Sequence, residues 1–351
     1  MYGSDRSFLQ VVEYLLKSGK YSEIAVVLPR SGPLSDRLVD LGVNPVFVNL
    51  SLLSKTYLKT FQWGKILFPL FKLREKAKLI SQYDVMYVNT SVILDFYLIA
   101  PFLTLKKIIH IREIPGNLMS SVLSPLIVNS GATVIFNSYA TKEAFSSFHR
   151  YFVIHNAFEG YRIIANEVFS LPEDPLKILL IGRVNSWKGQ DFAISALKNM
   201  AGQKFILRIV GSTSLGNEGL LLKLKQEVKI NGLENNIFFE EFCEHPEEVY
   251  RWSDLVIVPS KKPEPFGRIA IEAMSLGKPL VVADHGGLTE IINEQCGTLF
   301  TPNNEESFRI AILKYIGNRA LLSLQGQAAL NRYKEKFSIS GFHSQLDLVF
   351  S

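Results

Sequence analysis

The sequence predicts an α/β protein with two domains, each built on a parallel sheet that is covered by helices on both faces. Two observations support this fold class. Short apolar runs rich in β-branched residues alternate with segments of helical length along the whole chain. The 351 residues also exceed what one ordinary core accommodates. With 47% apolar and 20% charged residues, the chain is neither disordered nor a coiled coil.

The first half of the chain contains one alternating series. Apolar spacing predicts a helix over residues 8–18, with Ser4 or Asp5 as its N-cap. The strands expected in this half are residues 24–28, 45–48, 85–89, 107–111 and 133–137. Short β-branched runs between helices are typical of parallel strands that are buried on both faces.

The alternation pauses at residues 159–175, where no clear period is visible and two prolines bracket acidic residues. We place the linker between the domains there. Residues 1–165 are expected to form an N-terminal domain and residues 166–335 a C-terminal domain. Residues 336–351 are expected to form a helix that packs back toward the N-terminal domain.

A second alternating series follows the pause. Its expected strands are residues 177–181, 205–210, 237–239, 255–259 and 279–283. Its expected helices are residues 190–200, 218–231, 267–276, 305–317, 320–336 and 341–350. Ligands bind at the carboxyl ends of the strands in such sheets, and two facing domains would share one cleft. The residues just after each strand are therefore the candidates for function.

The net charge of +5 is unevenly distributed. Residues 1–170 contain 18 basic and 12 acidic residues, a balance of +6, whereas residues 171–351 contain 20 and 21, a balance of −1. A basic surplus favours polyanionic partners. No recognised nucleic-acid module is present, so we do not expect nucleic acid to be a partner. Two cysteines, Cys243 and Cys296, are too few for a disulfide scaffold and lack the C-x-x-C spacing of structural zinc sites.

The loop after strand 177–181 carries two cations. Arg183 and Lys188 lie five residues apart in residues 182–189, which open the next helix. Two cations beside a helix N-terminus favour an anion such as a pyrophosphate. An ordinary solvated loop with incidental charges is the alternative.

Two glutamates follow strand 255–259. Glu264 lies on the loop, and Glu272 lies a little over two helical turns further on, in an apolar helix. A buried carboxylate needs a partner, and the vicinal hydroxyls of a ribose would satisfy it. The alternative is an ordinary helix ion pair between Glu272 and Arg268, four residues apart.

Two further strand ends carry weaker signals. Gly286 and Gly287 follow strand 279–283 and would let a ligand approach the backbone, although a tight turn is the plainer interpretation. His110 lies near the end of strand 107–111, where it is either a core histidine or a group of the active site.

Together these residues resemble the retaining glycosyltransferases of the GT-B fold, specifically glycosyl transferases group 1 (family 4), of the bacterial surface-polysaccharide type. The resemblance spans nearly the whole chain. The matching motifs are G-R-x4-K-G at residues 182–189, E-x7-E at 264–272 and G-G-x-x-E at 286–290. Each falls at the expected strand end and in the expected order.

The resemblance implies a role for each candidate residue. Arg183 and Lys188 would hold the diphosphate of the donor and stabilise the leaving group, and Glu272 would bind its ribose. Glu264 would contact the transferred sugar near the reaction centre, and His110 would touch that sugar from the opposite domain. The other donor contacts implied are Gly182, Phe266, Gly267, Gly287, Leu288 and Thr289.

The implied chemistry is electrostatic. Departure of a nucleoside diphosphate builds negative charge that Arg183 and Lys188 would stabilise. The sequence contains no Asp-x-Asp, which agrees with a metal-independent site without a cofactor, where a nucleotide-diphosphate sugar is the donor substrate. Retention would follow a same-face route in which the leaving phosphate helps to deprotonate the acceptor.

The N-terminus departs from the family pattern. Tyr2-Gly3-Ser4-Asp5-Arg6 corresponds to the Gly-rich loop G-G-x-E-R, so Gly3, Ser4 and Arg6 are candidates for an acceptor or phosphate loop. Met1 stands where the family has a first strand. We therefore expect either that the sequence starts too late to include that strand or that the N-terminal sheet lacks it.

The acceptor and the location are inferred from composition. Neither a membrane span nor a signal peptide is visible, so a cytoplasmic protein is expected, with the inner face of the cytoplasmic membrane as a possible site of action. Residues 61–78 mix aromatic residues with cations, which suits an anionic bilayer or a lipid-linked substrate; an ordinary surface helix is the alternative.

The expected function is sugar transfer from a nucleotide sugar to a lipid-linked glycan during surface-polysaccharide synthesis. A relative with a soluble acceptor and an inactive nucleotide-sugar-binding remnant are the alternatives. An NAD-dependent dehydrogenase is disfavoured because no strand is followed by G-x-G-x-x-G.

Overall fold

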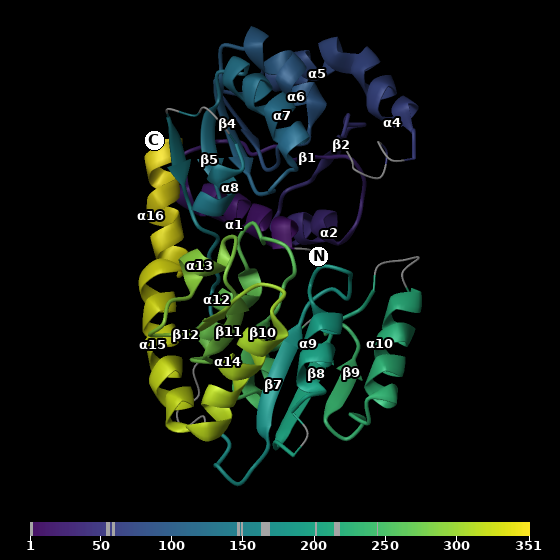
Figure 1. The fold of residues 1–351 in the computed structure, drawn as a ribbon. Helices are drawn as coiled ribbons and strands as arrows, with labels where there is room; N and C mark the ends of the chain where they lie inside the picture. Colours follow the sequence, from purple (N-terminus) through teal and green to yellow (C-terminus); the bar gives the residue numbers. More distant parts are fainter. Residues whose placement is uncertain are drawn as a thin grey trace. The chain divides into compact units, whose positions relative to one another are not determined.

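A computed structural model describes residues 3–351 except 54–56, 58–59, 146–147, 149, 163–168, 201, 214–217 and 244. The chain divides into two compact units (Figure 1). Unit 1 contains Met1–His155 and Gln345–Ser351, and unit 2 contains Asn156–Ser344. The boundary that we predicted after residue 165 lies outside the described residues, and the division falls ten residues earlier.

Unit 1 is an α/β unit in which every strand pair is parallel. Its strands are β1 (Val27–Leu28), β2 (Val46–Phe47), β3 (Val85–Val88), β4 (Lys106–Ile111), β5 (Thr133–Phe136) and β6 (Tyr151–Val153). Its helices are α1 (Gly3–Ser18), α2 (Pro33–Asp40), α4 (Trp63–Leu67), α5 (Leu73–Ile80), α6 (Leu94–Ile99), α7 (Asn117–Asn129) and α8 (Tyr139–Glu143), with 3-10 turns η1 (Phe68–Lys72) and η2 (Ala100–Phe102).

The described strands of unit 1 form two separate sheets. One pairs β1 with β2, and the other has the order β3-β4-β5-β6. The described part of the chain begins with α1, which starts at Gly3 rather than at residue 8 as predicted. The earlier start is favourable because Asp5 in the first turn stabilises the positive end of the helix dipole.

The C-terminal residues 345–351 complete unit 1. They form the end of α16 (Ile339–Phe350), where Asp347 accepts a hydrogen bond of 2.7 Å from the hydroxyl of Tyr14 in α1. Lys20 forms an ion pair of 2.7 Å with the same carboxylate. The ring of Phe350 packs against Tyr14 and against Tyr87 of β3.

The described residues of unit 2 form one parallel sheet of six strands. They are β7 (Leu176–Ile181), β8 (Phe205–Val210), β9 (Ile237–Glu240), β10 (Leu255–Val258), β11 (Leu280–Ala283) and β12 (Gly297–Phe300). The helices are α9 (Gln190–Leu197), α10 (Glu218–Ile230), α11 (Glu247–Trp252), α12 (Arg268–Ser275), α13 (Leu288–Ile291), α14 (Glu305–Gly317), α15 (Ala320–Lys336) and the first part of α16.

Two apolar clusters, one on each face, bury this sheet. One cluster joins the sheet to α9, α10 and α14, and the other joins it to α12, α13 and α15. Unit 2 is therefore doubly wound, which confirms the predicted fold class for this half of the chain. The strand order β12-β11-β10-β7-β8-β9 reverses between β7 and β10. Sheets of this kind bind ligands beside such a reversal.

Candidate active site

The three motifs of the second half lie at the carboxyl ends of three neighbouring strands. Residues 182–189 follow β7, residues 259–267 follow β10, and residues 284–287 follow β11. Because β7, β10 and β11 are adjacent and parallel, these loops meet at one edge of the sheet. This edge includes the reversal of strand order.

A glycine brings the first two loops together. Gly189 begins α9 with a φ of +80°, and a Cβ atom added there would lie 1.9 Å from the carbonyl oxygen of Pro259. Only glycine accommodates this approach. Within the same loop, Asn185 Oδ1 accepts hydrogen bonds from the backbone N–H groups of Trp187 and Lys188, at 3.1 and 3.0 Å.

Lys188 and Glu264 form an ion pair at the point where these loops meet. Lys188 Nζ lies 2.8 Å from Glu264 Oε1, and the two side chains are only 16% and 7% exposed. Lys188 Nζ also lies 4.8 Å from the centroid of the Trp187 ring. A shielded pair of this kind provides one cation for an anionic ligand and one carboxylate for hydroxyl groups, provided that the ligand replaces both partners.

Ser260 also holds the carboxylate of Glu264. The Ser260 hydroxyl donates to the same Oε1 atom, and its carbonyl oxygen lies 2.8 Å from Nε2 of His285. The sequence did not single out Ser260 or His285, because neither belongs to a recognisable spacing. Arg183, the second predicted cation, lies in the same loop as Lys188 and is exposed.

The paired glycines pack against the loop that carries Glu264. A Cβ atom added at Gly286 would lie 2.6 Å from the carbonyl oxygen of Glu264, and one added at Gly287 would lie 2.6 Å from Cα of Phe266. The N–H group of Gly287 donates to the Glu264 carbonyl at 2.8 Å. The glycine pair therefore fixes the backbone around the predicted sugar-binding carboxylate.

The side chains of two predicted donor contacts face the core. Phe266 and Leu288 are buried in the cluster between the sheet and α12. A ligand at this edge could reach only their backbone atoms. Gly267 starts α12 with a φ of +119°, and the Thr289 hydroxyl donates to the carbonyl of Gly286 at 2.9 Å.

Glu272 is buried on α12 between two partners. Its Oε2 atom accepts a hydrogen bond of 3.0 Å from the Tyr250 hydroxyl, and its Oε1 atom lies 3.8 Å from Arg268 Nε. The plainer interpretation of Glu272 as the partner of Arg268 is thus realised. Tyr250 was not predicted, because it comes from α11 and only the fold brings it to Glu272.

His110 is fully buried at the end of β4 in unit 1. Its Nδ1 atom lies 2.9 Å from the Tyr87 hydroxyl and 3.1 Å from Nη2 of Arg112. Burial, aided by the charge of Arg112, lowers the pKa of His110 well below its ordinary value. Arg112 donates, so Nδ1 accepts and the network assigns the proton of the neutral ring to Nε2.

The Nε2 atom of His110 has no hydrogen-bond partner among the described residues. A buried N–H group without a partner is costly, so this atom is a candidate for contact with a ligand oxygen. Around it, Asn89 Oδ1 accepts from Arg112 Nε at 2.7 Å and from the Tyr87 hydroxyl at 3.1 Å. Sequence reasoning missed Tyr87, Asn89 and Arg112 as a network, because no motif spans the ends of β3 and β4.

The prediction that Gly3, Ser4 and Arg6 form a loop is wrong, because all three residues lie inside α1. The cause is the favourable helix start described above. The carbonyl of Ser4 accepts a hydrogen bond of 3.3 Å from Asn89 Nδ2. The first turn of α1 is therefore next to the polar network of His110.

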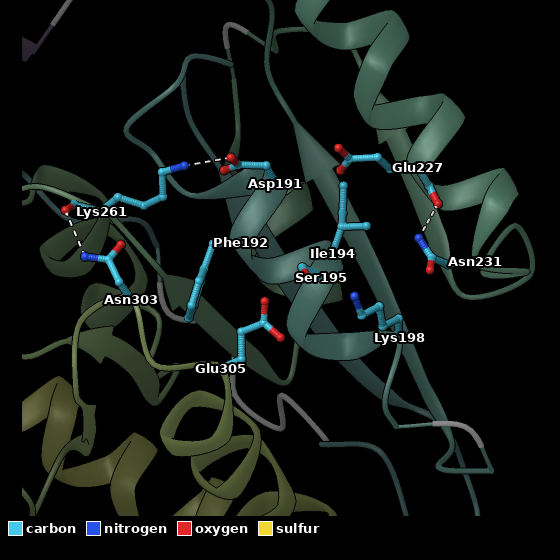
Figure 2. A pocket seen from close by; sticks show the side chains of 10 residues that line it. All are labelled: Asp191, Phe192, Ile194, Ser195, Lys198, Glu227, Asn231, Lys261, Asn303 and Glu305. Carbon is cyan, nitrogen blue, oxygen red and sulfur yellow. Dashed lines mark hydrogen bonds and ion pairs between the residues drawn. The ribbon is translucent and has the colours of Figure 1, made fainter.

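A cavity of about 560 Å³ opens on unit 2 beside the loop that follows β10, because Lys261 of that loop lines it (Figure 2). Its wall includes Asp191 and Ile194 of α9 and Lys198 just after that helix, and the Asp191 carboxylate forms an ion pair of 2.6 Å with Lys261. None of the predicted donor residues lines it. The motif residues, rather than this cavity, form the candidate site.

The described residues show neither a metal-binding cluster nor a membrane span. They contain no cluster of three or more histidine, cysteine, aspartate or glutamate side chains placed to hold a metal ion. None of the helices that they form has the length and apolar character of a membrane span.

Comparison with known proteins places these motifs in a family. Residues 163–335 match the family model described as glycosyl transferases group 1. Mannosylfructose-phosphate synthase of Agrobacterium fabrum is 31% identical over 48% of this chain and 39% of that protein. The lipopolysaccharide core biosynthesis mannosyltransferase LpcC of Rhizobium leguminosarum is 27% identical over 48% of this chain and 49% of that protein. The matches thus span less than half of these relatives.

The fold also matches solved structures along its length. The crystal structure of Anabaena Alr3699/HepE in complex with UDP-glucose covers 100% of this chain and 96% of that chain, with a TM-score of 0.80 and 21% identity. The α/β fold with parallel sheets is thus that of GT-B glycosyltransferases, as predicted. Residues 163–335 of the chain, which contain all three motifs, are therefore similar to the family glycosyl transferases group 1.

Proposed function

We propose that this protein is a glycosyltransferase that moves a sugar from a nucleotide-diphosphate sugar to an acceptor glycan, with retention of the anomeric configuration. The observation that carries the proposal is the shielded pair of Lys188 and Glu264 at the reversal of strand order in a group 1 domain. This pair offers a cation for the diphosphate and a carboxylate for sugar hydroxyls.

Binding of the donor opens the ion pair. The diphosphate binds Lys188 and Arg183, and the hydroxyls of the sugar donate hydrogen bonds to the carboxylate of Glu264. Neither the Lys188 ammonium group nor the Glu264 carboxylate is then left without a partner. The N-terminus of α9, which follows Gly189, adds its dipole to the same anion. Ser260 keeps the Glu264 carboxylate in place while Lys188 exchanges its partner.

In the transfer step, the bond between the anomeric carbon and the phosphate oxygen breaks while the bond to the acceptor oxygen forms on the same face. The acceptor hydroxyl gives its proton to the leaving phosphate. Lys188 and Arg183 stabilise the negative charge of that phosphate, which supplies the electrostatic help without a metal ion or a cofactor. Glu264 orients the sugar and is not assigned a covalent step.

Two further residues take part through hydrogen bonds. Glu272 binds the hydroxyls of the ribose, with Tyr250 holding its second oxygen in place. His110 donates from Nε2 to a sugar hydroxyl as a neutral imidazole, because its lowered pKa keeps it uncharged.

The acceptor that we propose is a lipid-linked glycan in surface-polysaccharide synthesis, which places the protein in the cytoplasm at the inner face of the membrane. The similarity to the mannosyltransferase LpcC and the basic surplus of residues 1–170 support it. A soluble acceptor is the second candidate, and the similarity to mannosylfructose-phosphate synthase favours it. The intact Lys188–Glu264 pair argues against an inactive remnant.

A thermal-stability screen against a panel of nucleotide sugars tests the proposal. Ligand binding to the folded state raises the unfolding temperature, so a matching donor should stabilise the protein. Lys188→Ala should abolish that stabilisation, whereas Lys198→Ala should keep it, because Lys198 is an exposed lysine just after α9 and outside the motifs. If no nucleotide sugar stabilises the wild-type protein, or if Lys188→Ala responds as the wild type does, the proposal fails.

A further inference from the structure

Five large apolar side chains within residues 61–71 of unit 1 are exposed to solvent. They are Phe61, Trp63, Leu67, Phe68 and Phe71, and between 48% and 85% of each side chain is exposed. We call this set the aromatic face. Phe61 precedes α4, and the other four residues lie on α4 and η1, near the label α4 in Figure 1. A group of exposed apolar side chains this dense marks an interaction surface.

The segment that carries the aromatic face is firmly attached to unit 1 by its other side. Ile66 is buried, and its carbonyl oxygen accepts a hydrogen bond from the Ser51 hydroxyl. The carbonyl of Pro69 accepts a hydrogen bond of 3.0 Å from Lys76, whose ammonium group forms a buried ion pair with Asp95. Because the inward side is already packed, the aromatic face is left pointing outward.

Cations surround the aromatic face. Lys65, Lys72, Arg74 and Lys78 are exposed within residues 61–78, against one exposed acid, Glu75. The 3.8 Å pair between Lys72 and Glu75 is highly exposed and contributes little. Apolar rings next to basic side chains suit the boundary between water and an anionic bilayer, where the rings enter the headgroup layer and the cations meet lipid phosphates.

We propose that the aromatic face docks unit 1 on an anionic lipid bilayer. Charge decides against a second copy as the occupant, because a symmetric dimer through this face would bring the four cations of one copy against those of the other. The inference deepens the proposed function by naming the surface at which a lipid-linked acceptor would be met. Docking itself requires neither donor binding nor transfer.

Co-sedimentation with vesicles tests the docking. The probes are vesicles of phosphatidylcholine alone and vesicles that also contain phosphatidylglycerol. The full chain should bind the vesicles that contain phosphatidylglycerol at low salt and lose that binding at high salt. It should not bind vesicles of phosphatidylcholine alone. Phe68→Ser/Phe71→Ser should lower the partition coefficient about tenfold or more. Lys72→Gln/Arg74→Gln should lower it about fivefold for each cation removed.

Helix α10 of unit 2 provides matched controls. Leu222 and Ile230 are 68% and 74% exposed, and Lys223 and Lys225 are exposed on the same helix. Leu222→Ser/Ile230→Ser and Lys223→Gln/Lys225→Gln should bind the vesicles as the wild type does. All variants change exposed side chains, so their unfolding temperatures should equal that of the wild type.

Several outcomes would overturn the docking proposal. The wild type could fail to bind anionic vesicles, or it could bind both kinds of vesicle equally. The α10 control variants could also lose as much vesicle binding as the variants of the aromatic face and its cations. Sedimentation velocity adds another, since a wild-type dimer that Phe68→Ser/Phe71→Ser dissociates would assign the face to a second copy. Stabilisation by nucleotide sugars is measured without vesicles, so failure of the docking and failure of the proposed function remain distinguishable.

Discussion

The two polar sites of this molecule are built in different ways. The site of unit 2 depends on backbone approach, with Gly189 against Pro259 and Gly287 against Phe266. The site of unit 1 depends on buried side chains, with His110 and Arg112 at the end of β4. Backbone approach requires glycine at fixed spacings and therefore leaves a motif in the sequence. A side-chain network on neighbouring strands leaves none, and its importance is visible only in the fold.

The largest effect is expected from the charged pair of unit 2. Lys188→Ala should lower the rate of donor turnover about 10²- to 10³-fold, because it removes a preorganised cation from the leaving phosphate and leaves Glu264 without its cationic partner. Lys198→Ala is the matched control. Steady-state release of the nucleoside diphosphate measures both. An effect of less than about threefold would show that Lys188 acts only in substrate binding or not at all.

The backbone constraint itself can be tested at Gly189. Gly189→Ala should destabilise unit 2 by about 3 kcal/mol or more, because the new methyl group would overlap the Pro259 carbonyl. Gly202 has a similar φ of +88° but open space around its Cα. Gly202→Ala should therefore cost only about 1 kcal/mol. Urea unfolding measures the free energy of unfolding of both variants. If both lose the same amount, φ strain, and not the close approach of two loops, explains why residue 189 is glycine.

The buried histidine of unit 1 should make stability depend on pH. In the folded state the pKa of His110 is lowered, so below about pH 6.5 the unfolded chain binds a proton that the folded chain does not. Stability is full above that pH and falls as pH decreases, by at most about 1.4 kcal/mol per pH unit, until the folded pKa is reached.

Urea unfolding between about pH 7 and pH 5 measures this effect. His110→Gln should flatten the decrease, whereas His245→Gln, at an exposed position of unit 2, should leave it unchanged. An unchanged slope in His110→Gln would contradict the assignment of His110 as a neutral hydrogen-bond donor.

The smallest effect is expected at Ser260. Ser260→Ala removes one hydrogen bond to the carboxylate of Glu264 but leaves Lys188 in place. Turnover should fall about fivefold to tenfold. Ser253 is also buried, and its hydroxyl donates to the Tyr250 carbonyl at a distance of 2.8 Å. Ser253→Ala should leave turnover near that of the wild type, and a similar loss in both variants would remove Ser260 from the site.

The sequence predicted those strands that are long and rich in β-branched residues. Strand β8 has the predicted bounds, and β7 and β10 differ from theirs by one residue. Strand β12 was missed because Gly297–Phe300 is short and contains glycine and threonine rather than an apolar run. For β1, residues 24–28 were predicted, but only Val27 and Leu28 pair with β2.

Within the site, the sequence predicted the charged groups and the glycines, but not the residues that hold them. Tyr250 and Ser260 contact Glu272 and Glu264 only because α11, β10 and α12 pack together. Such contacts join residues that share no spacing pattern. The N-terminal loop was predicted wrongly for a related reason, since favourable helix-start residues extended α1 over Gly3, Ser4 and Arg6.

The most direct test of the central claim is the release of nucleoside diphosphate from a panel of nucleotide sugars by the full chain. The Lys188–Glu264 pair should open for at least one donor. The wild type should then release the nucleoside diphosphate of that donor, whereas Lys188→Ala and Glu264→Ala should not. Release by neither the wild type nor the variants, or equal release by all three, would contradict the assignment of this pair as the donor site.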